Sequence, residues 1–356
     1  MVYTPLHLKH RPTDFLSVKG QDHVTLLLGK QVESKSVPNC IILYGPSGVG
    51  KTTVSRIIAK LLNDHPSGTI EIDSALDGGK DSVKQVQLDL YNYPLSGEFK
   101  TYIYNEAQEL TRQSFGSLLN MLEEPPEHVR FILVTNNFDK IPLNIKSRSQ
   151  SHHFSQLPNS LLREELSSIC KKEKRTIKDS LLNCAVYSSG GSFRNALVAL
   201  EIILNLQDCN LDEEAISDML GIVGIPRLTD LVISYISKDF SKMHSIVKHL
   251  CSENLDSSKS LYEIQQFLMD CRIFLIDPSI SQDLKSDIKS FSDRFSKFVG
   301  KKVDNFSMEE RKTFGRILDK IYDISLDTEA HLHRTLNKEA LFTRFLIQLA
   351  TSWNGN

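Results

Sequence analysis

Residues 45–52 follow the pattern G-x-x-x-x-G-K-T, which is typical of phosphate-binding loops. Glycines in such a loop allow backbone N–H groups to point inward around a phosphate chain, and the start of the following helix adds positive charge. We expect Lys51 to reach the β- and γ-phosphates of ATP and Thr52 to ligate Mg²⁺. The residues of this segment predicted to bind the nucleotide are Gly45, Pro46, Ser47, Gly48, Val49, Gly50, Lys51, Thr52 and Thr53.

A second candidate site follows the apolar segment 99–104, which ends in Asn105 and Glu106. In NTPases, a strand placed in this way after a P-loop ends in the Walker B carboxylates. The first of these holds the hydration shell of Mg²⁺, and the second orients and deprotonates the attacking water. Asn105 keeps an acceptor oxygen but lacks the negative charge. We therefore predict that Asn105 contacts the metal through water and that Glu106 is catalytic; the alternative is that both residues only end a strand.

Three further polar residues fit phosphate chemistry, although each also has a simpler interpretation. Asn136 follows the apolar segment 129–135 and could contact the γ-phosphate or the attacking water, but Asn is equally typical of a turn. Arg148 fits an arginine finger acting across a subunit boundary, and equally a surface arginine. Arg194 lies in the first turn of a predicted helix, where a cation opposes the helix dipole, which weakly indicates an anionic partner.

The elements that must position these residues can be predicted from apolar periodicity. The run from Cys40 to Tyr44 predicts a buried strand before the loop, and the spacing from Val54 to Leu62 predicts a helix after it. We predict an α/β P-loop domain with a parallel sheet in residues 1–156 and a small helical lid in 157–224. An all-α bundle that assembles subunits is predicted in 225–356. Its helical spacing recurs in 228–236, 243–250, 261–275, 314–324 and 341–350.

The composition is that of an ordinary folded protein. The 356 residues are 40% hydrophobic and 24% charged, and the net charge of −2 argues against a wholly basic nucleic-acid binder. The first ten residues have no apolar core of a signal peptide, and no apolar stretch is long enough to span a membrane. Six cysteines without C-x-x-C pairs predict free thiols in a reducing cytoplasm.

Several motifs together resemble the AAA+ clamp-loader ATPases, and among them the gamma/tau subunits of bacterial DNA polymerase III. The similarity runs nearly without gaps from about residue 8 to residue 206 and continues more weakly to the C-terminus. The most specific motif is Leu-Glu-Glu-Pro-Pro-Glu-His at 122–128, together with Gly-Ser-Phe-Arg at 191–194. The other matching segments are 11–12, 18–21, 45–53, 71–73, 114–119 and 147–148.

The resemblance implies roles for residues that the pattern alone left open. Thr135 and Asn136 match the sensor 1 position, and Arg194 matches the sensor 2 arginine that reaches the γ-phosphate from the lid. Arg148 matches the arginine finger of a Ser-Arg-Cys motif, in which Ser149 here replaces the cysteine. The segments matching the adenine pocket implicate Arg11, Val18 and Gly20.

Three departures from the family pattern qualify these expectations. A short turn at 63–69 replaces the four-cysteine zinc module of bacterial relatives, so we predict no zinc. Asn105 replaces the Walker B aspartate, which predicts slower hydrolysis. We also expect no tau-like C-terminal extension, and the departures from the family pattern suggest a bacteriophage or divergent bacterial version.

The expected function is that of an ATP-driven motor subunit of a sliding-clamp loader. Its expected partners are other loader subunits in a pentameric ring, the sliding clamp and primer–template DNA, without a membrane, in the cytoplasm of a bacterium or of a phage-infected host. Candidate DNA contacts are Lys80, Lys84 and Arg112, and the candidate clamp-binding face carries residues 88–95 and 111–122. Two alternatives remain open: a regulatory subunit that binds ATP without hydrolysing it, and a different AAA+ machine that remodels DNA.

Overall fold

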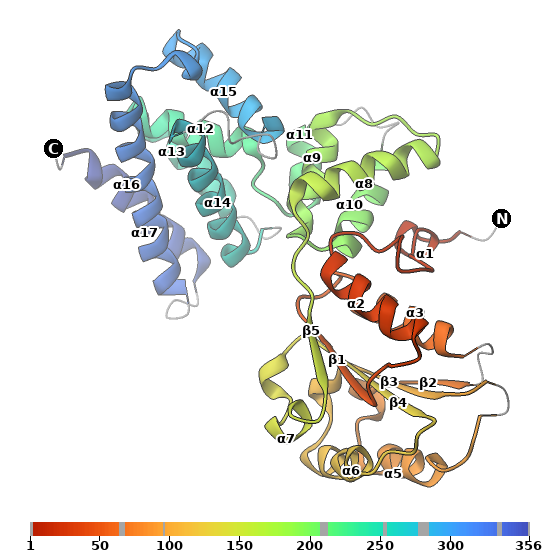
Figure 1. Cartoon of the computed structure of the whole chain (residues 1–356). Coiled ribbons are helices and arrows are strands. Elements are labelled where there is room, and N and C mark those ends of the chain that lie inside the picture. Colours follow the sequence, from red (N-terminus) through yellow and green to blue (C-terminus); the bar gives the residue numbers. More distant parts are fainter. Residues whose placement is uncertain are drawn as a thin grey trace. The chain divides into compact units, whose positions relative to one another are not determined.

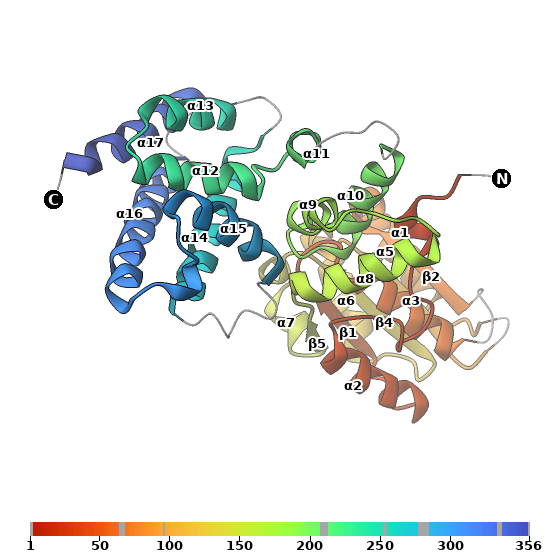
Figure 2. The same cartoon turned by 90° about the horizontal axis from the view of Figure 1, so that it is seen from above.

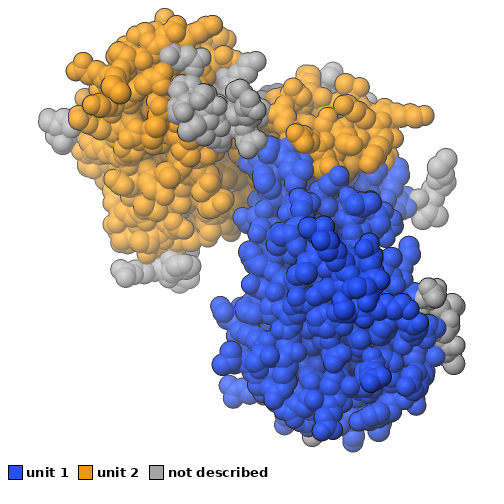
Figure 3. Space-filling model, viewed as in Figure 1, with its two compact units in different colours: residues 1–162, 189–198 blue, residues 163–188, 199–356 orange. Residues whose placement is uncertain are grey.

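The computed structural model describes residues 3–63, 68–94, 97–206, 213–251, 255–276, 285–332 and 337–354. The chain divides into two compact units, which Figure 3 shows in separate colours. Unit 1 comprises residues 1–162 and 189–198, and unit 2 comprises residues 163–188 and 199–356. The finer division into three domains, with boundaries after residues 156 and 224, stays a prediction.

Unit 1 contains a sheet of five parallel strands in the order β2-β3-β4-β1-β5 (Figure 1). The predicted strands are present, and the structure adds an edge strand that the sequence did not predict, because its residues are mostly polar. The strands are β1 (Cys40–Tyr44), β2 (Thr69–Asp73), β3 (Lys100–Asn105), β4 (Val129–Thr135) and β5 (Gln150–His153).

Helices cover both faces of this sheet, because successive side chains of each buried strand point to opposite sides. Cys40 and Ile42 pack in one core with α5 (Lys80–Asp89) and α6 (Arg112–Glu123). Ile41 and Leu43 pack in the other core with α2 (Asp22–Glu33) and α3 (Lys51–Leu62). Figure 1 shows these helix pairs on opposite faces of the sheet. The unit also contains the short helices α1 (Leu6–Lys9), α4 (Ser74–Asp77) and α7 (Leu143–Lys146).

The parallel arrangement brings the carboxyl ends of three strands to one edge of the sheet. Tyr44 of β1 pairs with Thr135 of β4, and Tyr104 of β3 pairs with Leu133 of β4. The P-loop after β1, Asn105 and Glu106 at the end of β3, and Asn136 after β4 therefore meet at this edge. This is the position at which open α/β sheets bind ligands.

Two helices of unit 1, α2 and α6, are capped in different ways. Thr111 caps α6, because its Oγ1 accepts a hydrogen bond from the Ser114 N–H at 3.1 Å. Asp22, in contrast, is the first helical residue of α2, and the capping position is Gln21, whose side chain does not bond to the helix. Gln21 instead joins Ser155 after β5, donating to its carbonyl at 2.8 Å. The Asp22 carboxylate still complements the helix dipole in the first turn.

Unit 2 is helical throughout the residues that the structure describes, as predicted for this part of the chain. The helices α14 and α16 run side by side and form its longest helix pair (Figure 2). Phe295 of α15 stacks on Phe314 of α16 with ring centroids 4.4 Å apart. The apolar spacing did not predict α15, because few apolar side chains interrupt its Lys, Ser and Asp residues. Unit 2 contains parts of α8 (Asn159–Lys172), α9 (Asp179–Ser189) and α10 (Phe193–Asn205), followed by α11 (Glu213–Met219), α12 (Ile225–Ile236), α13 (Phe240–Leu250), α14 (Ser257–Ile276), α15 (Lys285–Val299), α16 (Met308–Leu332) and α17 (Lys338–Thr351).

Five cysteines are free thiols, and Cys209 lies outside the described residues. None of the described helices combines the length and apolarity that crossing a lipid bilayer requires. Part of the turn predicted at 63–69 also lies outside the described residues.

Candidate nucleotide-binding site

The P-loop connects β1 to α3 through a backbone that requires glycine. Gly45 and Gly48 have φ values of +138° and +76°, which side chains of L-residues rarely allow. A Cβ on Gly45 would lie 2.1 Å from the Phe154 carbonyl oxygen, and one on Gly48 would lie 2.0 Å from Ser192 Oγ. The glycines therefore provide both the loop conformation and the close approach of neighbouring segments.

Lys51 begins α3 and is 5% exposed. Its Nζ donates hydrogen bonds to the carbonyl oxygens of Gly45 and Pro46 and, at 2.7 Å, to Asn136 Oδ1. Burial lowers the pKa of Lys51 to about 8, an effect that Glu106 opposes and the Arg194 charge reinforces. The ammonium group is thus held at the start of a helix, where a phosphate would also meet backbone N–H groups.

Glu106 adopts a left-handed backbone conformation with φ of +50°, which is uncommon for a residue other than glycine. Holding a residue in such a conformation costs about 1–3 kcal/mol and often marks a functional site. The carboxylate accepts hydrogen bonds from Asn136 Nδ2 at 3.0 and 3.2 Å and from Gln108 Nε2. Asn136 therefore bridges Lys51 and Glu106, so the sheet edge brings these three predicted residues together.

Asn105 is joined to the neighbouring strand β2 rather than to Glu106. Its Nδ2 donates a hydrogen bond to Glu71, whose carboxylate also accepts from Arg56 at 2.7 and 2.8 Å. Burial opposes ionisation of Glu71, but its hydrogen bonds with Arg56 and Asn105 lower the pKa overall. With the amide nitrogen fixed in this way, Asn105 Oδ1 is left as a buried acceptor without a protein partner.

That unpartnered oxygen suits the hydration shell of a magnesium ion. Mg²⁺ prefers oxygen ligands and keeps several of its waters, which need acceptors in the protein. Thr52, the other predicted metal ligand, is the second residue of α3 and is half-buried. The donor set at this edge therefore fits a hydrated Mg²⁺ ion, with one carboxylate fewer than an Asp-Glu pair would provide.

Arg194 approaches the P-loop from the start of α10. Its backbone N–H donates to the Gly48 carbonyl at 3.2 Å, and its charge contributes to the lowered pKa values of Lys51 and Arg11. The turn before it is fixed by Ser192, whose Oγ accepts from the Asn195 N–H at 3.3 Å. The segment 189–198 belongs to unit 1, so Arg194 and the P-loop form one site within that unit.

The residues predicted to line an adenine pocket have different environments. Arg11 donates from Nε to Thr53 Oγ1 at 3.2 Å, next to the P-loop, and burial followed by repulsion from Arg56 lowers its pKa. Val18 is buried in the core that the sheet forms with α2 and α3. A Cβ on Gly20 would lie 2.3 Å from Leu157 Cδ2, so this glycine permits close packing. Of the three, only Arg11 is tied by a side-chain hydrogen bond to a P-loop residue.

Arg148 makes no described contact with the nucleotide site of its own chain. Its side chain is 40% exposed, pairs with Glu123 at 3.0 Å and donates to the Asn144 carbonyl at 3.2 Å. Among the predicted DNA-binding residues, Lys84 and Arg112 are exposed on α5 and α6, whereas the side chain of Lys80 lies outside the described part of the chain.

Two residues of the site were not predicted to have a role there. Gln108, in a 3₁₀ turn after Glu106, contacts both Glu106 and the end of β4. Glu71 matched the family pattern, but its bond to Asn105 depends on the pairing of Asp73 with Asn105 in the sheet. The proximity of Gln108 to Glu106 in sequence was the available signal, whereas Glu71 required the strand order.

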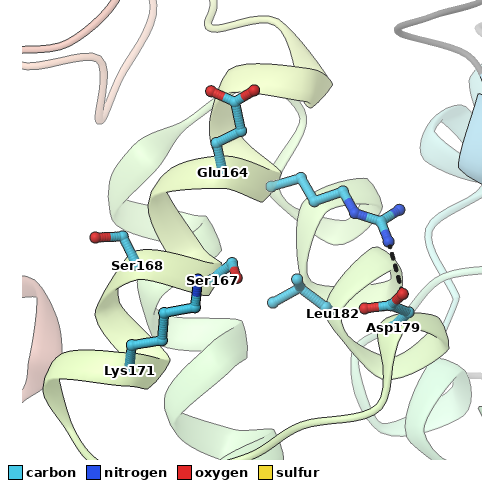
Figure 4. A pocket seen from close by; sticks show the side chains of 7 residues that line it. Glu164, Ser167, Ser168, Lys171, Asp179 and Leu182 are labelled. Carbon is cyan, nitrogen blue, oxygen red and sulfur yellow. Dashed lines mark ion pairs between the residues drawn. The ribbon is translucent and has the colours of Figure 1, made fainter.

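A separate hollow of about 350 Å³ lies on unit 2 between α8 and α9 (Figure 4). Its one arginine, Arg163, is paired with Asp179 at 3.3 Å and donates a hydrogen bond to Asn183 Oδ1 at 2.7 Å. The hollow is lined by Arg163, Glu164, Ser167, Ser168, Lys171, Asp179 and Leu182.

Within the described ranges, no group of three or more His, Cys, Asp or Glu side chains could hold a metal ion. The absence of zinc stays a prediction.

Comparisons with known proteins agree with this P-loop architecture. A family model described as DNA polymerase III, delta subunit, matches residues 70–158. The DNA polymerase III subunit gamma/tau of Mycoplasma genitalium is 32% identical over 281 residues, covering 72% of this chain and 47% of that protein. The DNA polymerase III subunit gamma of Buchnera aphidicola subsp. Schizaphis graminum is 28% identical over 324 residues, covering 84% of this chain and 89% of that protein.

Among solved structures, a single-substitution variant of RuvB from Thermotoga maritima is similar with a TM-score of 0.52 and 17% identity. The similarity covers 74% of this chain and 91% of RuvB, and at this identity it indicates the fold alone. The chain spans about half of the Mycoplasma relative and most of the Buchnera one. In its sequence the chain is therefore similar to DNA polymerase III subunits of the AAA+ clamp-loader type, in agreement with the P-loop architecture of unit 1.

Proposed function

We propose that this chain is the ATP-hydrolysing motor subunit of a sliding-clamp loader. The main support is the hydrogen-bonded series from Lys51 through Asn136 to Glu106, next to the P-loop. A phosphate-binding lysine and a carboxylate able to activate water are thus joined by one amide at the edge of the sheet. Such an arrangement suits phosphoryl transfer to water, in which catalysis depends on positioning and electrostatic stabilisation.

In this proposal each residue of the site has a defined task. Backbone N–H groups of the P-loop and the Lys51 ammonium hold the β- and γ-phosphates, and Arg194 adds positive charge from α10. Glu106 accepts a proton from the attacking water, and Asn136, with Thr135 behind it, orients that water or the γ-phosphate. Arg11 contacts the nucleotide from the N-terminal segment.

Thr52 and, through a water, Asn105 are the residues that would hold Mg²⁺. A bound Mg²⁺ ion would supply positive charge that stabilises the phosphate groups during phosphoryl transfer. Asn105 provides an acceptor for a metal-bound water without adding charge, so we propose hydrolysis that is slower than with an aspartate. Zinc has no part in the proposal.

The proposed partners are inferred from exposed residues of the chain and from its similarity to DNA polymerase III subunits. Arg148 would act on the nucleotide of a neighbouring subunit in a pentameric ring, to which unit 2 would contribute assembly contacts. Exposed Leu88, Tyr91 and Tyr93 support clamp binding near the end of α5, because exposed apolar groups often mark protein interfaces. Primer–template DNA would contact basic residues such as Lys84 and Arg112 through phosphates, within a bacterial or phage-infected host cytoplasm.

A regulatory subunit that binds ATP without hydrolysing it is the second candidate. It is favoured by Asn105, which gives the metal one carboxylate fewer. Glu106 remains hydrogen-bonded beside Lys51, which favours the motor subunit instead.

The two candidates are separated by measuring steady-state ATP hydrolysis with the cognate subunits, clamp and primed DNA. Lys51→Ala is the test variant, and Lys60→Ala, an exposed lysine at the other end of α3, is the matched control. Stimulated turnover that disappears only in Lys51→Ala supports the motor subunit. ATP binding without turnover in the wild type supports the regulatory subunit, and a wild type that binds no ATP refutes both.

A further inference from the structure

Gln108 is held at both ends of its side-chain amide. Its Nε2 donates a hydrogen bond to Glu106 Oε2. Its Oε1 accepts from Thr135 Oγ1 at 2.6 Å and from the Asn136 N–H at 3.3 Å. One side chain thus joins the carboxylate after β3 to the last residue of β4 and to the residue that follows it.

These partners fix which way the amide faces. A hydroxyl and a backbone N–H require an acceptor on one side, and a carboxylate requires a donor on the other. Glutamine satisfies both from this position, whereas glutamate would place a second carboxylate against Glu106. The identity of residue 108 therefore matters more for Glu106 than for the end of β4, which needs only an acceptor.

Glu106 is consequently held between two neutral amides. Gln108 donates to Oε2, and Asn136 Nδ2 lies within 3.2 Å of both carboxylate oxygens. Amide donors stabilise a carboxylate without giving it a proton, so they leave it able to act as a base. The backbone of Glu106 is left-handed, a conformation that persists only where surrounding contacts hold the residue in place.

We propose that Gln108 is a positioning residue that fixes the orientation of the Glu106 carboxylate and couples it to Asn136. Gln108 acts through Glu106 and does not itself contact the reacting atoms. A displacement of Asn136 toward a bound γ-phosphate is then transmitted to Glu106 both directly and through the Gln108 amide. The inference rests on the proposed ATPase function.

The isosteric change Gln108→Glu separates this role from a merely structural one. An oxygen is retained toward Thr135 and Asn136, so the end of β4 keeps its acceptor. Only the donor toward Glu106 is lost, and a carboxylate replaces it. Gln108→Ala removes both contacts, and Gln85→Ala, at an exposed glutamine of α5, is the matched control.

We expect Gln108→Ala to lower kcat by about tenfold, which is less than the roughly 10²- to 10⁴-fold contribution of a general base because Glu106 itself is retained. Nucleotide affinity should stay within about twofold, because the P-loop is untouched. In Gln108→Glu, two neighbouring carboxylates take up a proton more readily than one, so the acidic limb of the kcat–pH profile moves up by about one pH unit. Gln85→Ala should match the wild type in kcat, affinity and pH profile.

Two results would overturn the inference alone. One is wild-type turnover with kcat and pH profile unchanged in both Gln108 variants. The other is an equal loss of affinity, kcat and thermal stability in Gln108→Glu, which would indicate that Gln108 has only a structural role. A wild type without turnover in the presence of all partners would overturn the proposed function together with this inference.

Discussion

Replacing Asn105 by aspartate restores the carboxylate that is expected at this position, but it also breaks an existing contact. Asn105 Nδ2 donates to the carboxylate of Glu71 on the adjacent strand. An aspartate has no donor there, so two carboxylates would face each other. The change therefore has a favourable effect on the metal and an unfavourable effect on the fold, and the two can be measured separately.

The unfavourable effect can be estimated from the contact. A hydrogen bond to a charged group contributes about 1.5–3 kcal/mol. The Glu71 side chain is 31% exposed, which reduces that contribution through solvent screening. Two like charges 4 Å apart repel by about 1 kcal/mol in water and about 4 kcal/mol near a protein surface. Because Arg56 pairs with Glu71, we expect a net loss of about 1–3 kcal/mol in the free energy of unfolding.

The favourable effect concerns Mg²⁺. A carboxylate next to the ion's water shell should stabilise the bound metal by about 1–3 kcal/mol, by analogy with the cost of removing a charged hydrogen-bond partner. That corresponds to a tenfold to hundredfold effect on rate or affinity. We therefore expect Asn105→Asp to raise kcat and to lower the Mg²⁺ concentration for half-maximal activity, while Tm falls by several degrees.

The assay compares the wild type with Asn105→Asp, Glu71→Gln and the double variant. It measures ATP turnover across Mg²⁺ concentrations, and Tm without nucleotide. The double variant should keep the gain in Mg²⁺ response and recover part of the Tm, because an amide at position 71 can donate to the new carboxylate. An unchanged rate and Mg²⁺ requirement in Asn105→Asp would refute the metal argument, and an unchanged Tm would refute the importance of the Glu71 contact.

Two further predictions concern charge at the phosphates. Because the pKa of Lys51 is lowered to about 8, the ammonium loses its proton as the pH rises through that value. The affinity for a fluorescent ATP analogue should therefore stay nearly constant between pH 6 and 7 and fall above pH 8. Equal affinity at pH 7 and pH 9.5 would contradict this. Arg148→Ala should lower kcat by about a thousandfold with affinity retained, as expected for an arginine finger. Glu123→Gln removes the same ion pair from the other side and should leave kcat unchanged. Equal losses of kcat in both variants would indicate that the ion pair is structural.

The sequence predicted most of the fold because its strong signals are local. Strand β4 (Val129–Thr135) has the predicted bounds, since an uninterrupted apolar run is typical of a strand buried on both faces. Strand β5 (Gln150–His153) lacked that signal, because its polar residues form a strand only by pairing with β1. Helix α15 (Lys285–Val299) was likewise missed, since its burial depends on a few phenylalanines that pack against other helices.

The site was predicted to the extent that motif and strand-end position specify it. Lys51, Glu106 and Asn136 follow three different strands, and the parallel sheet brings these three side chains together. Glu71 and Gln108 are different, because their roles depend on side-chain contacts between neighbouring strands. The sequence shows which residue types are present at the strand ends, but it does not show which amide meets which carboxylate.

The amides at this edge have a common electrostatic consequence. The carboxylate of Glu106 accepts from the amides of Gln108 and Asn136, and the position expected to hold a second acid is occupied by another amide, Asn105. Negative charge near the P-loop is therefore limited, while Lys51 and Arg194 remain positive. Such a balance favours binding of an anionic triphosphate but weakens the hold on its metal ion. Nucleotide binding should therefore tolerate the loss of Mg²⁺ better than turnover does, because turnover also requires the metal to neutralise charge as the phosphoryl group transfers.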